Sequence, residues 1–240
     1  MNSFNSNSDL REKTLLKNNQ SLTSSTTEAL TDKDKPFKRD NIIFYPINDY
    51  SQLKMFNANF KDLQTELIKL IINDENRSND QKIFQPWIEH DLYSQSNPTG
   101  WDIAPFMINK CLIEKNCILA PYLYEIIKTI PFLVSVSYSL LKPNTHIIPH
   151  KGYDEYSEKI LRYHMGMIIP NGDLGIRVAN EMKIWKEGES FIFDDYQIHE
   201  AWNFTNDNRY VLICDFIEPE SEIGKISDEN FNKSIGFYMK

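Results

Sequence analysis

The sequence is poor in positive charge and in long apolar runs. It has 26 Lys and Arg against 34 Asp and Glu, a formal net charge of -8, and the charges are scattered along the chain. A chain of this charge without a basic stripe is not expected to bind nucleic acid or an anionic lipid surface. The longest apolar runs, such as residues 67–72, are far too short to cross a bilayer. We therefore expect no membrane insertion.

Cysteine is also scarce, with Cys111, Cys117 and Cys214 showing no spacing typical of a metal site. This usage predicts reduced thiols in the cytoplasm, although one disulfide remains formally possible. Residues 1–30 contain no apolar stretch of the signal-peptide kind. We therefore expect a soluble, cytoplasmic protein.

The N-terminal part divides into a tail and a flanking region. Residues 1–40 are rich in Ser, Asn, Thr, Asp and Lys, which predicts a disordered tail. Residues 41–130 are predicted to be a helical and irregular region packed on the core, with a packed irregular segment over 81–101. Apolar residues at helical spacing indicate a helix over 56–72, with Asn57 or Asn59 as a possible cap. Pro121 opens a second helix that ends near residues 129–130.

The pattern changes to strands after Pro131, and residues 131–220 are predicted to form the core, followed by an extension over 221–240. Short β-rich runs separated by turn residues cover 132–141, 161–169, 175–179, 190–193 and 209–217. Residues 186–189 are predicted to connect a hairpin. Helices followed by short strands predict a mainly β domain with flanking helices, a sandwich or barrel of the jelly-roll type.

Four of the five histidines lie in this β half. His150 follows a predicted strand, His199 comes much later, and Arg209 opens the next strand. Separated histidines with a following arginine are typical of a site for iron and a dicarboxylate, because a guanidinium binds a carboxylate through two parallel hydrogen bonds. The sequence supplies the donors but does not establish that they converge.

Taken together, the β half resembles the catalytic domain of the aspartyl/asparaginyl β-hydroxylase family. The resemblance is carried by SLLKPNTHIIPHKG (139–152), LRYHMGMIIP (161–170), IRVANEMKIWKEGESFIFDDYQIHEAWN (176–203) and RYVLICDFIEP (209–219). It implies a double-stranded β-helix (jelly-roll or cupin-like) that uses Fe(II), 2-oxoglutarate and O₂. On the matching positions, it implies His150 and His199 as iron ligands and Arg209 as the partner of the distal carboxylate of 2-oxoglutarate. Ser139, Arg162 and His164 fall on further cosubstrate-binding positions, and His146 belongs to the motif without an assigned role.

Gly152 stands where many 2-oxoglutarate oxygenases place a carboxylate that completes a 2-His-1-carboxylate triad. A glycine is usual there in the family that this chain resembles. Asp154 has unsuitable spacing to replace that ligand. Asp194 and Asp195 are other candidate carboxylates, and we expect them to shape the turn before His199 or to orient a histidine.

The resemblance implies an enzyme that hydroxylates its substrate and releases succinate and CO₂. The expected substrate is a small-molecule, carrier-bound or peptide one: a free or carrier-bound amino acid, or a peptidyl Asp or Asn. Relatives that hydroxylate acyl chains are membrane-associated, and the chain has no visible anchor. The stretch 153–159, longer than the usual link, is a candidate to shape substrate choice. Trp185, Trp202 and Tyr163 either line a substrate cleft or belong to the core.

Two other classes remain open. One is a catalytically silent β-sandwich that binds a metabolite or a partner protein. The other is a cupin-like metalloenzyme that does not use 2-oxoglutarate. Cupin sites place two histidines close together in one motif, which His146 with His150 would allow.

Overall fold

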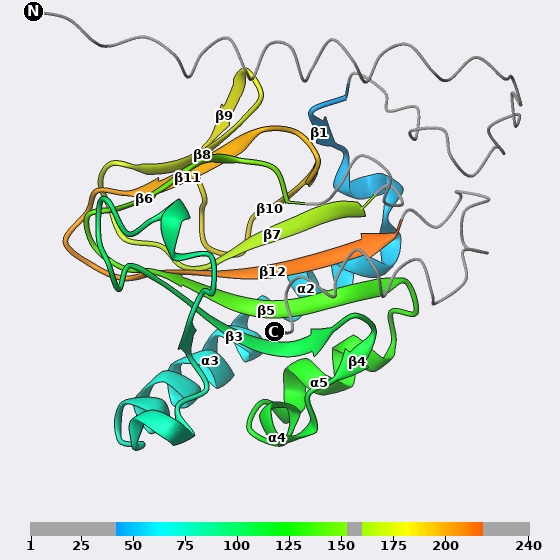
Figure 1. Cartoon of the computed structure of the whole chain (residues 1–240). Coiled ribbons are helices and arrows are strands. Elements are labelled where there is room, and N and C mark those ends of the chain that lie inside the picture. The colour runs from blue at the N-terminus through cyan, green and yellow to red at the C-terminus, as the bar shows by residue number, and fades with distance from the viewer. Residues whose placement is uncertain (1–41, 153–159, 218–240) are drawn as a thin grey trace, which may run out of the picture. The chain divides into compact units, whose positions relative to one another are not determined.

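Two antiparallel β-sheets and a set of short helices make up residues 42–152 and 160–217, the part of the chain that the computed structural model describes (Figure 1). The strands are β1 (Phe44–Tyr45), β2 (Gln85–Pro86), β3 (Trp101–Ile108), β4 (Cys111–Leu112), β5 (Leu133–Leu141), β6 (Thr145–His150), β7 (Ile160–Ile168), β8 (Leu174–Val178), β9 (Glu181–Lys183), β10 (Ser190–Asp194), β11 (His199–Asn203) and β12 (Arg209–Ile217). The helices are α2 (Lys54–Ala58), α3 (Phe60–Glu75), α4 (Glu114–Cys117) and α5 (Pro121–Lys128), with 3-10 turns at Ile47–Asp49, Ser51–Leu53, Asn79–Gln81 and His90–Leu92.

The larger sheet has the order β1-β10-β7-β12-β5-β3-β2, with β4 paired to β3, and the smaller has the order β6-β11-β8-β9. From β5 onward the chain passes back and forth between the sheets, so that neighbours within a sheet come from separate parts of the sequence. This topology is the double-stranded β-helix predicted from the sequence, with helices against the larger sheet.

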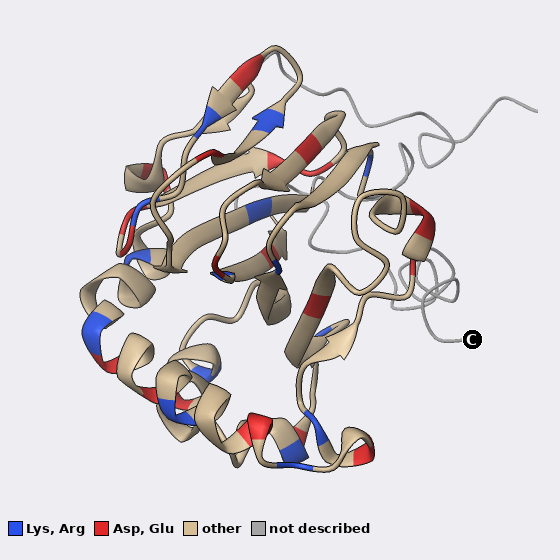
Figure 2. Cartoon of the chain, turned by 90° about the vertical axis from the view of Figure 1, so that its left-hand side faces the viewer, with Lys and Arg blue, Asp and Glu red and all other residues tan. Residues whose placement is uncertain are grey.

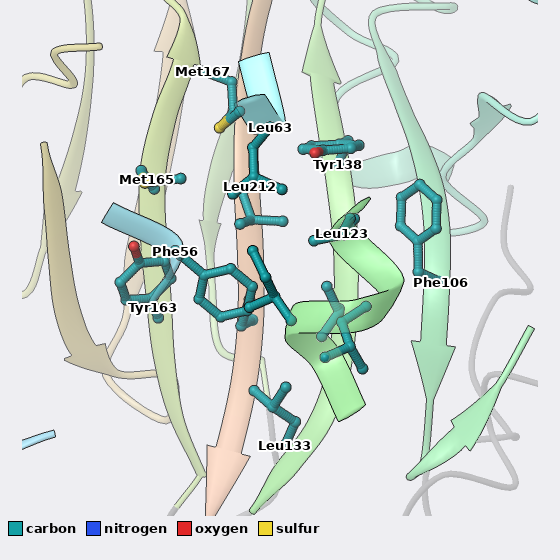
Figure 3. Close-up of a cluster of buried hydrophobic side chains, with 14 of the residues drawn as sticks. Phe56, Leu63, Phe106, Leu123, Leu133, Tyr138, Tyr163, Met165, Met167 and Leu212 are labelled. Atoms are coloured by element: carbon teal, nitrogen blue, oxygen red, sulfur yellow. The ribbon is translucent and has the colours of Figure 1, made fainter. Parts of the chain in front are cut away.

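The alternation of side chains along the central strands gives the larger sheet two buried faces. On β12, Leu212 faces the helices and packs with Leu63 of α3 and Leu123 of α5; we call this layer the outer core (Figure 3). Val211 faces the smaller sheet and packs with Ile176 of β8 in a second layer, the inner core. Because β12 is buried on both faces, polar groups on its inner face are shielded from water.

Helix α3 buries one apolar stripe, which includes Leu63, Leu67 and Leu70, against the larger sheet. The single helix predicted over 56–72 is broken at Asn59, which leaves α2 and α3 as separate helices. The capping prediction, Asn57 or Asn59, was wrong. Asn57 lies inside α2 and its amide donates to the Gly188 carbonyl at 2.9 Å. Asn59 makes no side-chain cap, and its amide donates to the Met55 carbonyl at 2.8 Å. No helix in the described ranges is long and apolar enough to span a membrane.

Helix α5 begins at Pro121, as predicted, and its first turn is held by a carboxylate from α3. Glu66 accepts hydrogen bonds from the Tyr122 and Leu123 amides at 2.7 and 2.9 Å. Free amides at a helix start carry partial positive charge, so an acceptor with negative charge is favourable there. The contact ties the two helices that cover the outer core.

We expect Glu66→Ala to lower the free energy of unfolding by about 1–2 kcal/mol, because two helix-start amides lose their acceptor. Urea denaturation measures this change. The control is Glu125→Ala, which removes an exposed pairing with Lys128 and is expected to cost almost nothing. Equal stability of the two variants would contradict the capping role.

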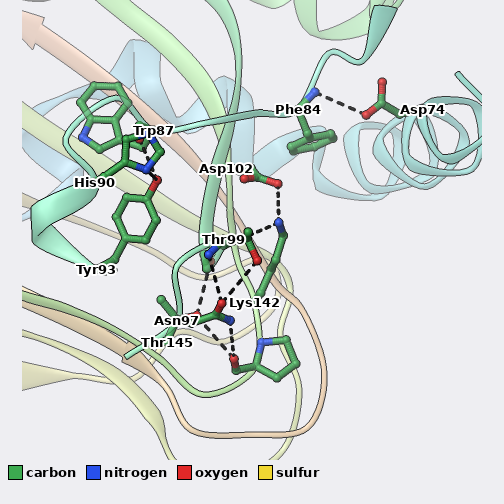
Figure 4. Close-up of polar contacts among 12 residues, drawn as sticks. Asp74, Phe84, Trp87, His90, Tyr93, Asn97, Thr99, Asp102, Lys142 and Thr145 are labelled. Atoms are coloured by element: carbon green, nitrogen blue, oxygen red, sulfur yellow. Dashed lines mark hydrogen bonds and ion pairs between the residues drawn. The ribbon is translucent and has the colours of Figure 1, made fainter. Parts of the chain in front are cut away.

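The segment before β3 is irregular, as predicted, and fixed by polar contacts (Figure 4). The Asp74 carboxylate accepts from the Ile83 and Phe84 amides at 2.6 and 3.4 Å. Lys142 pairs with Asp102 at 2.8 Å at the start of β3. These contacts hold β2 and β3 at the edge of the larger sheet.

The structure also differs from the sequence prediction at one turn and in strands that were not predicted, among them β3, β6, β9 and β11. His150, expected just past a strand, is the last residue of β6. Residues 186–189 form a turn but no hairpin, because β9 belongs to the smaller sheet and β10 to the larger. A turn signal shows where the chain reverses but not which sheet receives the next strand. The strand β3 lies in a region predicted as helical and irregular, and it joins the larger sheet beside β5 despite Pro105. The predicted tail (1–40), the stretch 153–159 with Asp154, and the extension 221–240 lie outside the described residues.

Charged side chains of both signs are spread over strands, helices and loops (Figure 2).

Candidate functional site

His150 and His199 lie side by side across the smaller sheet. They are direct partners in the antiparallel pairing of β6 with β11, and their ring centroids are 4.3 Å apart. The register shifts between His199 and Ala201, whose partner is Ile147. Without this bulge, residue 149 would stand opposite His199, so the extra residue is what brings His150 to the site.

Both imidazoles have the same local arrangement. The Nδ1 atom of His150 lies 2.8 Å from the Ile148 carbonyl, and that of His199 lies 2.8 Å from the Gln197 carbonyl. A carbonyl only accepts, so each Nδ1 carries the hydrogen and each Nε2 presents a lone pair. Burial lowers the pKa of both histidines, well below the usual value for His199, which favours the neutral form that a metal needs.

A carboxylate stands beside this pair, although it does not come from residue 152. Asp195 lies with Oδ1 3.5 Å from His199 Nε2 and 2.7 Å from Arg162. A Cβ atom added at Gly152 would overlap the Asp195 carboxylate. The glycine therefore leaves the space that Asp195 occupies. Within residues 42–152 and 160–217, no group of three or more His, Cys, Asp or Glu side chains is placed to hold a metal ion.

Asp194 and Asp195 have different surroundings. The Asp194 side chain accepts a hydrogen bond from the Tyr196 amide at 3.0 Å, which fits the predicted turn-shaping role. Arg162, predicted to bind the cosubstrate, joins Asp195 to Asp215, with its Nε 2.6 Å from the Asp215 carboxylate. Arg162 and Asp215 are register partners on β7 and β12, so strand pairing brings them together.

Ser139, His164 and Arg209 all project from the inner face of the larger sheet, on β5, β7 and β12. Ser139 is the register partner of Val211 and His164 is the partner of Ile213, which places both on the face of β12 that carries Arg209. The three residues are at most 5% exposed. The Arg209 guanidinium lies 3.4 Å from the Ser139 hydroxyl. The structure thus brings these predicted residues into one buried polar group.

Two tryptophans that sequence reasoning did not assign to the site contact this group. Trp101 donates its indole N–H to Ser139 Oγ at 3.0 Å. Trp185 donates to His164 Nδ1 at 3.3 Å, and its ring lies 4.7 Å from the Arg209 guanidinium carbon. The sequence predicts that Trp185 lines a cleft or belongs to the core, and its contacts with Arg209 and His164 become visible only in the folded structure.

The electrostatics of the polar group favour an anion. Burial lowers the pKa of Arg209 to about 9 and that of His164 well below its usual value. Among the described residues no carboxylate pairs with Arg209, and Arg209 Nε and His164 Nε2 have no hydrogen-bond partner. Buried donors of this kind are costly unless a ligand satisfies them. A carboxylate is the ligand whose charge and shape match a guanidinium.

The histidine pair and the polar group are connected by a row of aromatic rings. Phe193 lies 5.3 Å from His199 and 5.2 Å from His164 between ring centroids. Trp185 follows at 6.0 Å from His164. The two parts of the site are therefore neighbours within one inner core.

The remaining candidates lie elsewhere. The His146 ring is 2.8 Å from Glu200, on the face of the smaller sheet opposite the inner core, so it does not join His150 as a second cupin-type ligand. Tyr163 belongs to the outer core, between the larger sheet and the helices. Trp202 donates to Asp173 at 2.8 Å, on the face of the smaller sheet that also carries His146. Of the predicted cleft aromatics, only Trp185 reaches the site.

A cavity of about 480 Å³ opens beside His150, Gly152 and Arg162. Most of its wall area is apolar, from Ile83, Pro86, Trp87, Ile88, Trp101, Ile103, Pro105, Met107, Ile108, Ile113 and Ile213. Neutral polar groups come from Gln85, Asn109, Asn116, Ser135 and Ser137. Lys82, Glu89, Lys115 and Asp215 are the charged groups that also border it, besides Arg162. Ser139, His164 and Arg209 are not on this wall, but Trp101, which donates to Ser139, is.

The chain matches one protein family and is similar to individual known proteins. The model of the family described as Aspartyl/Asparaginyl beta-hydroxylase matches residues 57–219. An ornithine lipid ester-linked acyl 2-hydroxylase from Rhizobium tropici is 34% identical over 159 residues, which cover 65% of this chain and 54% of that protein. The human aspartyl/asparaginyl beta-hydroxylase is 41% identical over 85 residues, 35% of this chain and 11% of that protein.

The chain thus spans about half of the rhizobial relative and a small part of the human one. Among solved structures, a prolyl hydroxylase from Trichoplax adhaerens in complex with a peptide fragment aligns with 75% of this chain and 94% of its own, at 11% identity and a TM-score of 0.47. Because the family model matches more than half of the 240 residues, the chain belongs to the aspartyl/asparaginyl β-hydroxylase family.

Proposed function

We propose that the protein is an Fe(II)- and 2-oxoglutarate-dependent dioxygenase that hydroxylates its substrate and releases succinate and CO₂. One observation carries the proposal: two imidazoles that present Nε2 lone pairs have ring centroids 4.3 Å apart, in the same inner core as a buried arginine that has no carboxylate partner among the described residues. A metal ion and a diacid would satisfy both halves of this arrangement. A catalytically silent β-sandwich gives no reason for either feature.

The residues present fit both groups. His150 and His199 would hold the ferrous ion, since imidazole is a suitable ligand for it, burial favours the neutral form of both rings, and backbone carbonyls orient them. Arg209, with Ser139 and His164, would hold the far carboxylate of 2-oxoglutarate, because these donors are buried and partly unsatisfied. Bound iron with 2-oxoglutarate supplies the activation of O₂ that hydroxylation of an unactivated carbon requires.

The protein's own contribution is orientation and exclusion of water. The backbone carbonyls of Ile148 and Gln197 fix the two imidazoles. Arg162 holds the Asp195 carboxylate next to His199, where it would act as a hydrogen-bond acceptor at the edge of the proposed metal site. The inner core surrounds Arg209 with apolar and aromatic side chains, which strengthens its attraction for an anion.

For the substrate we first propose an amino acid or an Asp/Asn-type residue, in line with the human relative's name. The cavity favours a second candidate. Most of its wall area is apolar, with isoleucine, methionine, proline and tryptophan side chains, although Lys82, Lys115 and Arg162 also border it. An acyl chain fits such a wall, and the Rhizobium tropici relative is named for acyl 2-hydroxylation.

The proposal is tested first by binding. We expect Mn(II), a stand-in for Fe(II) that does not turn over, to raise the melting temperature, and 2-oxoglutarate to raise it further. Glutarate, which lacks the keto group, is the control ligand and is expected to add much less. A melting temperature insensitive to Mn(II) and 2-oxoglutarate together would favour the silent sandwich. A response to Mn(II) alone would favour a cupin-like enzyme.

Turnover is then measured as succinate released with Fe(II) and 2-oxoglutarate. The substrate panel contains free amino acids, Asp- and Asn-containing peptides, and acyl amphiphiles of increasing chain length. We expect one class to stimulate succinate release well above the level without substrate. Stimulation that grows with acyl length would support the cavity-based candidate, and stimulation by peptides alone would reject it.

A further inference from the structure

The imidazole of His164 has its hydrogen placed by Trp185. An indole N–H can only donate, so His164 Nδ1, 3.3 Å away, must be the acceptor. In a neutral imidazole the hydrogen then sits on Nε2. That atom is buried and has no partner in the described ranges. His164 is therefore set up as a hydrogen-bond donor with no acceptor among the described residues.

Trp185 also contacts the cation of the same group. Its ring lies 4.7 Å from the Arg209 guanidinium carbon, a distance typical of a cation–π contact. Arg209 Nε is buried and, among the described residues, has no partner. Trp185 thus contacts both His164 and Arg209, whose Nε2 and Nε donors have no acceptor among the described residues.

The hydroxyl of Ser139 shows the same pattern on the other side of Arg209. Ser139 Oγ accepts from Trp101 at 3.0 Å and from Arg209 at 3.4 Å, which engages both of its lone pairs. Its own hydrogen is then left to donate outward. Indole N–H groups therefore orient donors on both sides of the guanidinium.

We propose that Trp185 is a positioning residue for the carboxylate that Arg209 binds: its N–H keeps His164 in the Nε2-protonated form and its ring holds the guanidinium. Trp101 orients Ser139 in the same way. The identity of the ligand as 2-oxoglutarate rests on the proposed function; the donor arrangement rests on contacts within the chain alone. The opposing view is that Trp185, 2% exposed, only fills the inner core.

Trp185→Phe separates these views, because it keeps an aromatic ring in the core and removes the N–H. We expect the Kd for 2-oxoglutarate, measured by calorimetry with Mn(II) bound, to rise about five- to tenfold while Mn(II) affinity stays unchanged. Trp202→Phe is the matched control, since it removes an indole N–H bond to Asp173 on the outer face of the smaller sheet. It is expected to leave the Kd unchanged.

The tautomer of His164 gives a second readout that needs neither ligand nor turnover. In ¹⁵N-histidine-labelled protein, with the signal assigned through His164→Gln, long-range NMR spectra are expected to show hydrogen on Nε2. In Trp185→Phe we expect loss of this single tautomer. Wild-type protein with hydrogen on Nδ1 would overturn the proposal even if the variant did not fold.

The two proposals fail differently. Wild-type protein that bound no 2-oxoglutarate would reject the dioxygenase function and leave the tautomer result to decide the role of Trp185. Wild-type and Trp185→Phe proteins that bound 2-oxoglutarate equally would reject the positioning role and leave the dioxygenase function intact.

Discussion

His199→Ala is expected to reduce affinity for Fe(II) or Mn(II) by at least about 100-fold and to reduce succinate release below detection. The reason is the small number of ligands: a site that depends on two imidazoles loses half of its protein donors with one substitution, and changes even to groups that only orient a ligand typically cost about 10–100-fold. His150→Ala is expected to do the same. Calorimetry with Mn(II) measures the binding, and a succinate assay with Fe(II) measures turnover.

The matched control is His146→Ala. His146 lies on the same strand as His150 but contacts Glu200 on the other face of the sheet. It is expected to change metal affinity less than twofold. Because His199 is buried, circular dichroism should accompany each measurement to show that the variants fold. Folded His150 and His199 variants that retain normal metal affinity would show that the iron site lies elsewhere.

Arg209→Lys is expected to raise the Kd and the KM for 2-oxoglutarate by roughly 10- to 100-fold. Lysine keeps the positive charge but offers a point charge in place of the planar fork that binds both carboxylate oxygens. It also loses the contacts with Ser139 and with the Trp185 ring. We expect metal affinity to be nearly unchanged, so this variant and His199→Ala should affect different ligands.

Arg177→Lys is the control for that substitution. Arg177 pairs with Glu200 at 2.6 Å on the outer face of the smaller sheet, away from the inner core. Its KM for 2-oxoglutarate, measured from initial rates over a range of 2-oxoglutarate concentrations, is expected to match that of the wild type. A normal KM for Arg209→Lys would mean that the buried guanidinium serves stability and does not bind the cosubstrate.

Five of the eight described strands after Pro131 could be predicted, because turn residues and β-rich runs are local signals, but β6, β9 and β11 were not predicted. Arg209–Ile217 was predicted with both ends correct. Strand β3 was missed because Trp101–Ile108 contains a proline and is apolar without clear alternation. The supposed hairpin over 186–189 failed because the sheet that each strand joins depends on distant partners.

The candidate site could also be predicted only in part. The chemical types of its residues, two histidines and an arginine, could be read from the sequence. Their meeting could not, since it depends on a bulge between β6 and β11 that brings His150 opposite His199. The role inferred for Trp185 was also out of reach, because an indole N–H finds its acceptor through the fold and not through sequence spacing.

The position of Asp195 limits which side chains residue 152 can carry. A side chain at residue 152 would meet the Asp195 carboxylate, which is itself bound to Arg162. Installing an acid at residue 152 would therefore crowd two negative groups into one buried space and break an existing ion pair. In the proposed iron site, a carboxylate ligand at residue 152 would therefore also require the replacement of Asp195, so the two positions can change only together.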